Sequence, residues 1–228
     1  MSSTGCPPAE VLAEYRERFY LRARGPARQG FVYTSTKRLF DIAFSFLGLM
    51  LAWPLMVLAA IWVRLDSEGP ILYRQTRVGK DGAEFQMLKF RTMSDSAESL
   101  SGPVWAKIGD ERITRAGAIL RRLYIDELPQ LINILRGDMS FVGPRPERPF
   151  FYPKCEEAIP GFCARCVVQP GLTGLAQVRQ NHDGSLRAMR RKFRYDLLYI
   201  RKQTFLLDLW IMVRTTWLLW REFKEIWG

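Results

Sequence analysis

The sequence predicts a helix-rich, mixed α+β fold: a small cytoplasmic domain with a short β-hairpin, anchored by a Pro-kinked re-entrant membrane helix and by interfacial amphipathic helices. Three features predict it: an uncharged apolar segment at 42–63, two strand-like segments joined by an Asp-Gly turn, and a tryptophan-rich C-terminal segment. The 228 residues, 48% of them hydrophobic, suffice for one domain with a sizeable core. We divide the chain into an N-terminal appendage (1–36), the membrane helix (37–66) and the domain itself (67–228).

The chain is strongly basic, with 34 Lys and Arg against 23 Asp and Glu and a formal net charge of +11. This balance favours an anionic partner, which could be nucleic acid, phospholipid headgroups or a phosphorylated substrate. The four cysteines are few for this length, and the first residues lack the pattern of a secretory signal. A reduced, cytoplasmic setting is therefore expected.

The segment from Ile42 to Val63 is apolar and uncharged, and as a helix it would extend roughly 33 Å, enough to cross a bilayer. Pro54 near its middle predicts a kink, because proline removes a backbone hydrogen bond and clashes with the preceding turn. Basic residues flank both ends: Lys37 and Arg38 before it, and Arg64, Arg74, Arg77 and Lys80 after it. Since positive flanks favour the cytoplasmic side, a helix that enters, breaks and returns satisfies all three features. A kinked full span and a buried core helix are the alternatives.

Two segments after this helix, Pro70 to Val78 and Ala83 to Met93, read as strands joined by a turn containing Asp-Gly. In the second strand the period of two places Lys89 and Arg91 on one face and the apolar residues on the other.

Helices are predicted over 114–123 and 126–136, the second with apolar residues at helical spacing and Gly137 as its terminator. The segment 205–220 is mostly apolar and carries Trp210, Trp217 and Trp220. Tryptophans with a basic border are typical of a helix lying in the headgroup layer, and a helix packed on a soluble core is the alternative.

The pair Asp126-Glu127 places two carboxylates at a predicted helix start, where free amides favour anions. Helix capping is the simpler explanation, because Asp is a preferred N-cap residue. A functional role is favoured by the neighbouring cations. Arg121 lies just upstream, and Arg145 lies downstream between two prolines that restrict the backbone, so its guanidinium could be aimed at an anion with little ordering cost.

Several segments in a fixed order carry a family resemblance. They are the Pro-broken apolar helix, Lys89-Phe90-Arg91-Thr92-Met93, Ile125-Asp126-Glu127-Leu128-Pro129-Gln130, Gly137 to Glu147, Pro170-Gly171-Leu172-Thr173-Gly174, and Tyr195-Asp196 with Leu207-Asp208. From about Lys37 to Trp220 the chain resembles the bacterial sugar transferase family, the monotopic phosphoglycosyl transferases. Trp53 departs from the pattern, since many relatives carry Ser before the proline.

The resemblance implies a membrane enzyme that transfers a sugar-1-phosphate from a UDP-sugar to polyprenyl (undecaprenyl) phosphate during surface glycan, lipopolysaccharide or exopolysaccharide assembly. It implies the bacterial inner membrane, with the catalytic domain on the cytoplasmic face, membrane lipids as partners, and no nucleic acid. Asp126 would be the nucleophile, and Glu127, together with Asp126, would bind Mg²⁺. Lys89, Arg121 and Arg145 would bind phosphate oxygens, and Arg91 and Asp196 are further candidates for substrate binding.

Other interpretations stay open at this stage. Cys163 and Cys166 with Cys155 suggest zinc, but no fourth ligand has clear spacing and His182 stands alone. A basic, membrane-anchored scaffold or nucleic-acid-binding protein without catalysis would explain the charge, although not the order of the segments. A homodimer is also compatible with the sequence.

Overall fold

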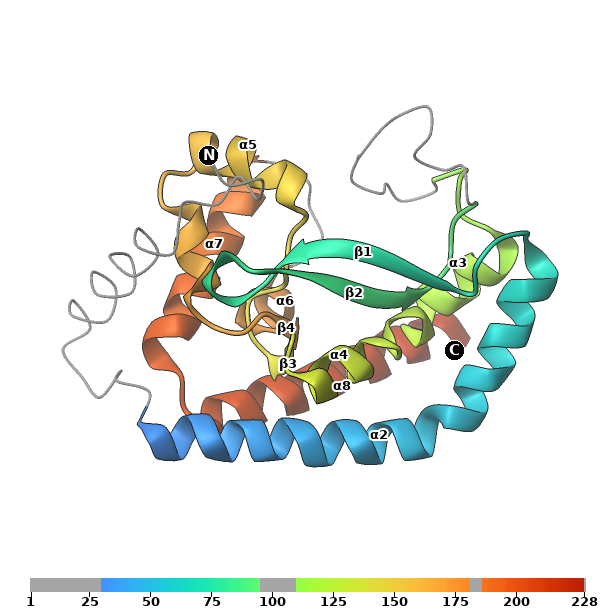
Figure 1. Ribbon diagram of the computed structural model, residues 1–228, viewed down its shortest axis with the longest axis horizontal. Coiled ribbons are helices and arrows are strands. Elements are labelled where there is room, and N and C mark those ends of the chain that lie inside the picture. The colour runs from blue at the N-terminus through green and yellow to red at the C-terminus, as the bar shows by residue number, and fades with distance from the viewer. Residues whose placement is uncertain (1–29, 95–109, 181–185, 228) are drawn as a thin grey trace.

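The computed structural model describes residues 30–94, 110–180 and 186–227, so most of the N-terminal appendage and His182 lie outside the described residues. Its fold is mixed and helix-rich, with two short two-stranded sheets (Figure 1). The elements are α2 (Phe31–Asp66), β1 (Leu72–Val78), η1 (Lys80–Gly82), β2 (Glu84–Phe90), α3 (Arg115–Arg122), η2 (Ile125–Glu127), α4 (Gln130–Arg136), β3 (Ser140–Val142), η3 (Pro149–Phe151), α5 (Tyr152–Ala158), η4 (Phe162–Val167), β4 (Gly171–Thr173), α6 (Leu175–Arg179), α7 (Leu186–Lys202) and α8 (Phe205–Trp227).

The long helix α2 contains the predicted membrane segment and begins at Phe31, so the end of the predicted appendage belongs to it. Within the described ranges it is the one helix long and apolar enough to cross a membrane, and 11% of its most apolar stretch is buried. A core helix of a soluble protein would be mostly buried, so this exposure argues against that alternative. Pro54 lies inside α2, and Figure 1 shows the ribbon of α2 turning toward β1 in its second half.

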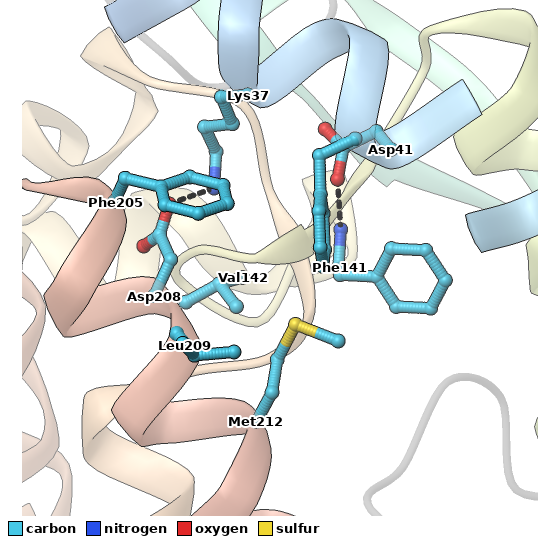
Figure 2. A pocket seen from close by; sticks show the side chains of 9 residues that line it. Lys37, Asp41, Phe141, Val142, Phe205, Asp208, Leu209 and Met212 are labelled. Atoms are coloured by element: carbon cyan, nitrogen blue, oxygen red, sulfur yellow. Dashed lines mark hydrogen bonds and ion pairs between the residues drawn. The ribbon is translucent and has the colours of Figure 1, made fainter. Parts of the chain in front are cut away.

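The first half of α2 is tied to the rest of the chain by two cations. Arg38 donates hydrogen bonds to the carbonyl oxygens of Ile134 (2.6 Å) and Leu135 (2.8 Å), in the last turn of α4. A cation at this end of a helix complements the helix dipole. Lys37 forms an ion pair of 2.6 Å with Asp208 of α8, as Figure 2 shows. α2 therefore lies against both α4 and α8.

The predicted β-hairpin is confirmed. β1 and β2 pair antiparallel, from Leu72 opposite Phe90 to Val78 opposite Glu84. The connecting turn contains Asp81 and Gly82, both with positive φ, which explains the Asp-Gly pair there.

The predicted helix over 114–123 is present as α3, and the Thr114 side chain caps it by accepting a hydrogen bond from the Gly117 amide. The helix predicted to start at Asp126 requires correction. The chain there forms the short 3₁₀ turn η2, and α4 begins only at Gln130. Pro129 precedes α4 and suits a helix start, because it has no amide hydrogen to satisfy.

A small parallel sheet, β3 with β4, lies beyond α4. Its strands continue into a close backbone contact in which Gly143 and Gly171 approach each other. A Cβ at Gly171 would lie 2.1 Å from the Gly143 nitrogen, so no side chain fits there. This contact holds the start of the Gly143-Pro144-Arg145-Pro146 segment, from which Arg145 extends.

The C-terminal helix α8 extends further than the predicted 205–220 and carries exposed tryptophans at 210, 217 and 220. Cations lie over two of these rings, Arg214 at 4.1 Å from the centre of Trp217 and Lys224 at 4.6 Å from that of Trp220. This combination of exposed indoles and adjacent cations is typical of helices at a membrane interface.

Candidate active site

The centre of the site is the turn η2, which presents Asp126 and Glu127. Tyr124, immediately before it, adopts the left-handed conformation (φ 57°), at a cost of roughly 1 to 2 kcal/mol for a residue with a Cβ. The turn places Asp126 in a nearly buried position, 6% exposed. Neither carboxylate caps α4, so the capping explanation does not account for the pair.

The environment of Asp126 disfavours the ionised form of its carboxyl. Burial raises its pKa from 3.8 to about 6; the charge of Lys89 opposes this rise, and that of Glu127 adds to it. Within the described residues, no group donates a hydrogen bond to this carboxylate. A desolvated, unpartnered carboxylate near cations is suited to nucleophilic attack, because its oxygens are not held by donors.

Glu127 is the centre of an ion cluster. It accepts a hydrogen bond of 2.7 Å from the Lys89 ammonium and further hydrogen bonds from the Arg145 guanidinium, one of them 3.3 Å long at its second oxygen. Burial opposes ionisation of Glu127, but the charges of Arg145 and Lys89 outweigh it and hold the pKa well below its usual range. Burial in turn lowers the pKa of Lys89, and the charge of Glu127 counters that effect. Three residues predicted for the site therefore lie together beside Asp126: Lys89, Glu127 and Arg145.

Lys89 reaches this cluster because β2 is attached to α4 through Asn133. This fully buried amide accepts a hydrogen bond from the Leu88 amide (2.9 Å) and donates one to the Gln86 carbonyl (2.8 Å). The strand therefore runs at a fixed distance from the helix that follows Asp126 and Glu127.

Arg145 is held at both its backbone and its side chain. Its carbonyl accepts a hydrogen bond of 2.7 Å from Arg165, which is itself paired with Asp196 at 2.8 Å, both 2% exposed. Its guanidinium also donates to the Leu172 carbonyl at 3.3 Å. The charge of Glu127 raises the pKa of Arg145, so this cation is permanently charged.

The structure places the other predicted residues around this centre. Asp196 forms a buried ion pair with Arg165, and Arg165 in turn binds the backbone carbonyl of Arg145. Arg121 donates a hydrogen bond of 2.8 Å to the Thr92 hydroxyl, and its positive charge lowers the pKa of Asp126, so it borders the site. Arg91 follows the end of β2 and is buried.

Arg91 contacts the end of α2 instead of the cluster. Its guanidinium donates to the carbonyl oxygens of Ser67 (2.6 Å), Pro70 (2.5 Å) and Val63 (3.4 Å). These contacts close the C-terminal end of α2, where carbonyl groups lack helical partners. The period of two predicted Arg91 on the same strand face as Lys89, but Arg91 lies beyond the end of β2 and contacts the end of α2, whereas Lys89 contacts Glu127.

Three contributors were not predicted: Asn133, Arg165 and Tyr124. Asn133 could have been noticed as a polar residue within the apolar pattern of its helix. Arg165 and Tyr124 have no linear signature, since their roles depend on residues distant in sequence or on a backbone angle.

Asp126 and Glu127 together fit a magnesium ion. Mg²⁺ commonly takes one or two protein carboxylates and completes its shell with water and substrate phosphate oxygens. Two adjacent carboxylates, one of them unpartnered, meet this requirement. Among the described residues no group of three or more His, Cys, Asp or Glu could hold a metal ion, and Cys155, Cys163 and Cys166 are buried and form no disulfide.

A buried carboxyl flanked by a carboxylate, an ammonium and a guanidinium has the groups that phosphate ester chemistry needs. A model described as bacterial sugar transferase matches residues 32–222. The chain therefore belongs to the bacterial sugar transferase family.

Named relatives agree with this family. The chain is 46% identical over 194 residues to the UDP-glucose:undecaprenyl-phosphate glucose-1-phosphate transferase of Caulobacter vibrioides (83% of this chain, 66% of the relative). It is 39% identical over 184 residues to the UDP-N-acetylgalactosamine-undecaprenyl-phosphate N-acetylgalactosaminephosphotransferase of Aeromonas hydrophila (81% and 43%). It is also 39% identical over 187 residues to the exopolysaccharide production protein PSS of Rhizobium leguminosarum bv. phaseoli (78% and 92%). The chain thus spans less than two thirds of the first two relatives and nearly all of the third.

Proposed function

We propose that this chain transfers a sugar-1-phosphate from a UDP-sugar to polyprenyl phosphate, giving polyprenyl diphosphate sugar and UMP at the start of glycan or exopolysaccharide assembly. The observation that carries the proposal is the Asp126 carboxyl, buried and unpartnered beside the Lys89-Glu127-Arg145 cluster. Family membership and the donors and acceptor named for the relatives agree with it. A non-catalytic scaffold would give no reason for a desolvated carboxylate at this point.

The reaction proceeds in two displacements. In the first, an Asp126 oxygen attacks the sugar-bearing phosphorus, the bond from that phosphorus to the bridging oxygen breaks, and UMP leaves with the electron pair. In the second, an oxygen of the polyprenyl phosphate attacks the same phosphorus, and the bond to Asp126 breaks to regenerate the carboxylate.

The neighbouring residues bind and orient the diphosphate. Lys89 and Arg145 already pair with the anionic Glu127, and their cationic groups would bind phosphate oxygens beside it, while Arg121 would contribute positive charge at the edge of the site. Asp126 and Glu127 would hold Mg²⁺, which when bound neutralises charge on the diphosphate.

The membrane helix brings the site to its lipid substrate. We infer that α2 is re-entrant, entering and leaving by the cytoplasmic face, which is supported by its exposed apolar surface, Pro54 and the change of direction in Figure 1. The tryptophans of α8 would lie among the headgroups of the bacterial inner membrane.

The test is to incubate the purified protein with a radiolabelled UDP-sugar panel and Mg²⁺, without polyprenyl phosphate, and then to quench it. Label on a peptide containing Asp126, with UMP released in equal amount, is expected. UMP release that begins only after polyprenyl phosphate is added, with no label on the protein beforehand, would indicate direct attack by the lipid phosphate. No release from any donor even with polyprenyl phosphate present would remove the proposed activity.

A further inference from the structure

The turn that carries Asp126 is connected to a distant helix by one side chain. The Tyr124 hydroxyl donates a hydrogen bond of 3.0 Å to a carboxylate oxygen of Glu222, near the end of α8. Figure 1 shows that end of α8 close to α3, from which the turn emerges. The two residues are 98 positions apart in sequence, so this contact exists only in the folded chain.

Tyr124 also controls the backbone of the turn. It occupies the position after the C-cap of α3 and has a positive φ of 57°, a conformation that glycine or asparagine usually supplies there. Its carbonyl accepts the hydrogen bond from the Glu127 amide (3.3 Å), and its own amide donates to the Arg121 carbonyl (3.1 Å). The backbone of Tyr124 therefore joins the end of α3 to the turn that carries Glu127.

The hydroxyl is within electrostatic reach of the cluster. Burial and the hydrogen bond to Glu222 raise the pKa of Tyr124 to about 12, and the charges of Glu127 and Arg145 also act on it.

We propose that Tyr124 and Glu222 are positioning residues, and that their hydrogen bond fixes the Asp126-Glu127 turn relative to α8. This inference rests on the proposed function, in which α8 lies at the membrane surface. The contact then aligns the nucleophile with the interface where the lipid phosphate head is located. Neither residue touches the reacting atoms.

The test compares substitutions in the full chain, reconstituted in nanodiscs with undecaprenyl phosphate and supplied with UDP-glucose or UDP-N-acetylgalactosamine. Tyr124→Phe removes only the hydroxyl and should lower kcat about five- to tenfold, the loss of one hydrogen bond, with KM for the UDP-sugar unchanged. Tyr124→Asn tolerates the same φ but cannot reach Glu222, so it should lose as much. Glu222→Ala should match Tyr124→Phe, whereas Glu222→Gln keeps an acceptor and should stay within about twofold of wild type.

Two controls separate this role from simple stabilisation. The double variant Tyr124→Phe/Glu222→Ala should be no slower than either single variant, because one contact is lost in each. Glu225→Ala removes a surface carboxylate of the same helix that pairs with Arg221, and it should leave kcat unchanged. Normal kcat in Tyr124→Phe, or additive losses in the double variant, would overturn the inference. A wild type that releases no UMP from any donor would instead defeat the proposed function itself.

Discussion

The Glu127 carboxylate and the Lys89 ammonium lie 2.7 Å apart, and this pair joins the turn after α3 to the last residues of β2. This ion pair places two charged groups next to Asp126, and neither group forms a hydrogen bond with the Asp126 carboxyl. The two adjacent carboxyls therefore have opposite electrostatic situations, one favoured as an anion and one disfavoured, and substitutions should affect them differently.

Asp126→Asn should abolish UMP release, because an amide is a poor nucleophile of nearly the same shape. The same change should stabilise the fold at neutral pH. Folding raises the pKa of Asp126 from 3.8 to about 6, so the ionised carboxylate opposes folding at higher pH by up to about 3 kcal/mol. Thermal unfolding at pH 7.5 should show a higher Tm. A lower Tm would mean that the carboxylate has a stabilising partner.

Glu127→Gln should have the opposite effect on stability. Its folded pKa lies below the unfolded value of 4.5, so the stabilisation from Lys89 and Arg145 is present above that pH and is lost only in strong acid. Removing the charge should lower the free energy of unfolding by on the order of 2 kcal/mol at pH 7.5. The variant should also need more Mg²⁺ for half-maximal turnover. A Mg²⁺ titration of activity together with thermal unfolding would check both. An unchanged Mg²⁺ requirement would remove Glu127 as a ligand.

The pH dependence of turnover should report Asp126. On the proposed function Asp126 must be ionised to attack, so kcat should fall below a midpoint near pH 6, and not near pH 4 as for an ordinary aspartate. Initial rates of UMP release between pH 4.5 and 8.5 would measure the midpoint, with protein integrity verified by near-UV circular dichroism at each pH. A midpoint near 4 would contradict the burial described for this carboxyl.

Arg145→Lys should lower kcat about a hundredfold, because a point charge does not replace a planar fork that contacts Glu127 and, on the proposed function, would bind the diphosphate. Arg136→Lys, on the exposed side of α4, is the matched control and should be neutral. Steady-state measurement of kcat for both variants would test whether Arg145 contributes to the site. Comparable rates in the two would exclude Arg145 from the site.

The re-entrant topology predicts that both ends of α2 face the cytoplasm. Thr36→Cys and Glu68→Cys are suitable probes because both positions are exposed and neither is one of the contacts that anchor α2. In a background lacking the native cysteines, an impermeant maleimide should label both in inverted vesicles and neither in intact spheroplasts. Labelling of one position from each side would establish a full span.

The hairpin, α3 and most of α4 were predictable because each depends on local chemistry: an Asp-Gly turn, a threonine cap and an apolar helical repeat. The start of α4 was not, since Asp126 and Glu127 have the composition of a helix start while Tyr124 imposes a different backbone angle. For the site, proximity in sequence identified the carboxyl pair and the proline-flanked Arg145. It could not reveal that Arg91 binds carbonyl oxygens at and just beyond the end of α2, or that Asp196 pairs with Arg165, because packing determines which groups are buried and which partners they meet.

The two hydrogen bonds from Arg38 to the end of α4 attach this helix, which follows Asp126, to α2. On the proposed function, the reacting carboxylate then sits at a constant height above the lipid tails. The site would then select an acceptor by the depth of its phosphate group in the membrane. The isoprenoid tail would stay in the bilayer. Such an enzyme should accept carriers of different tail length almost equally, while a water-soluble phosphate ester of the same head would rarely reach the carboxylate.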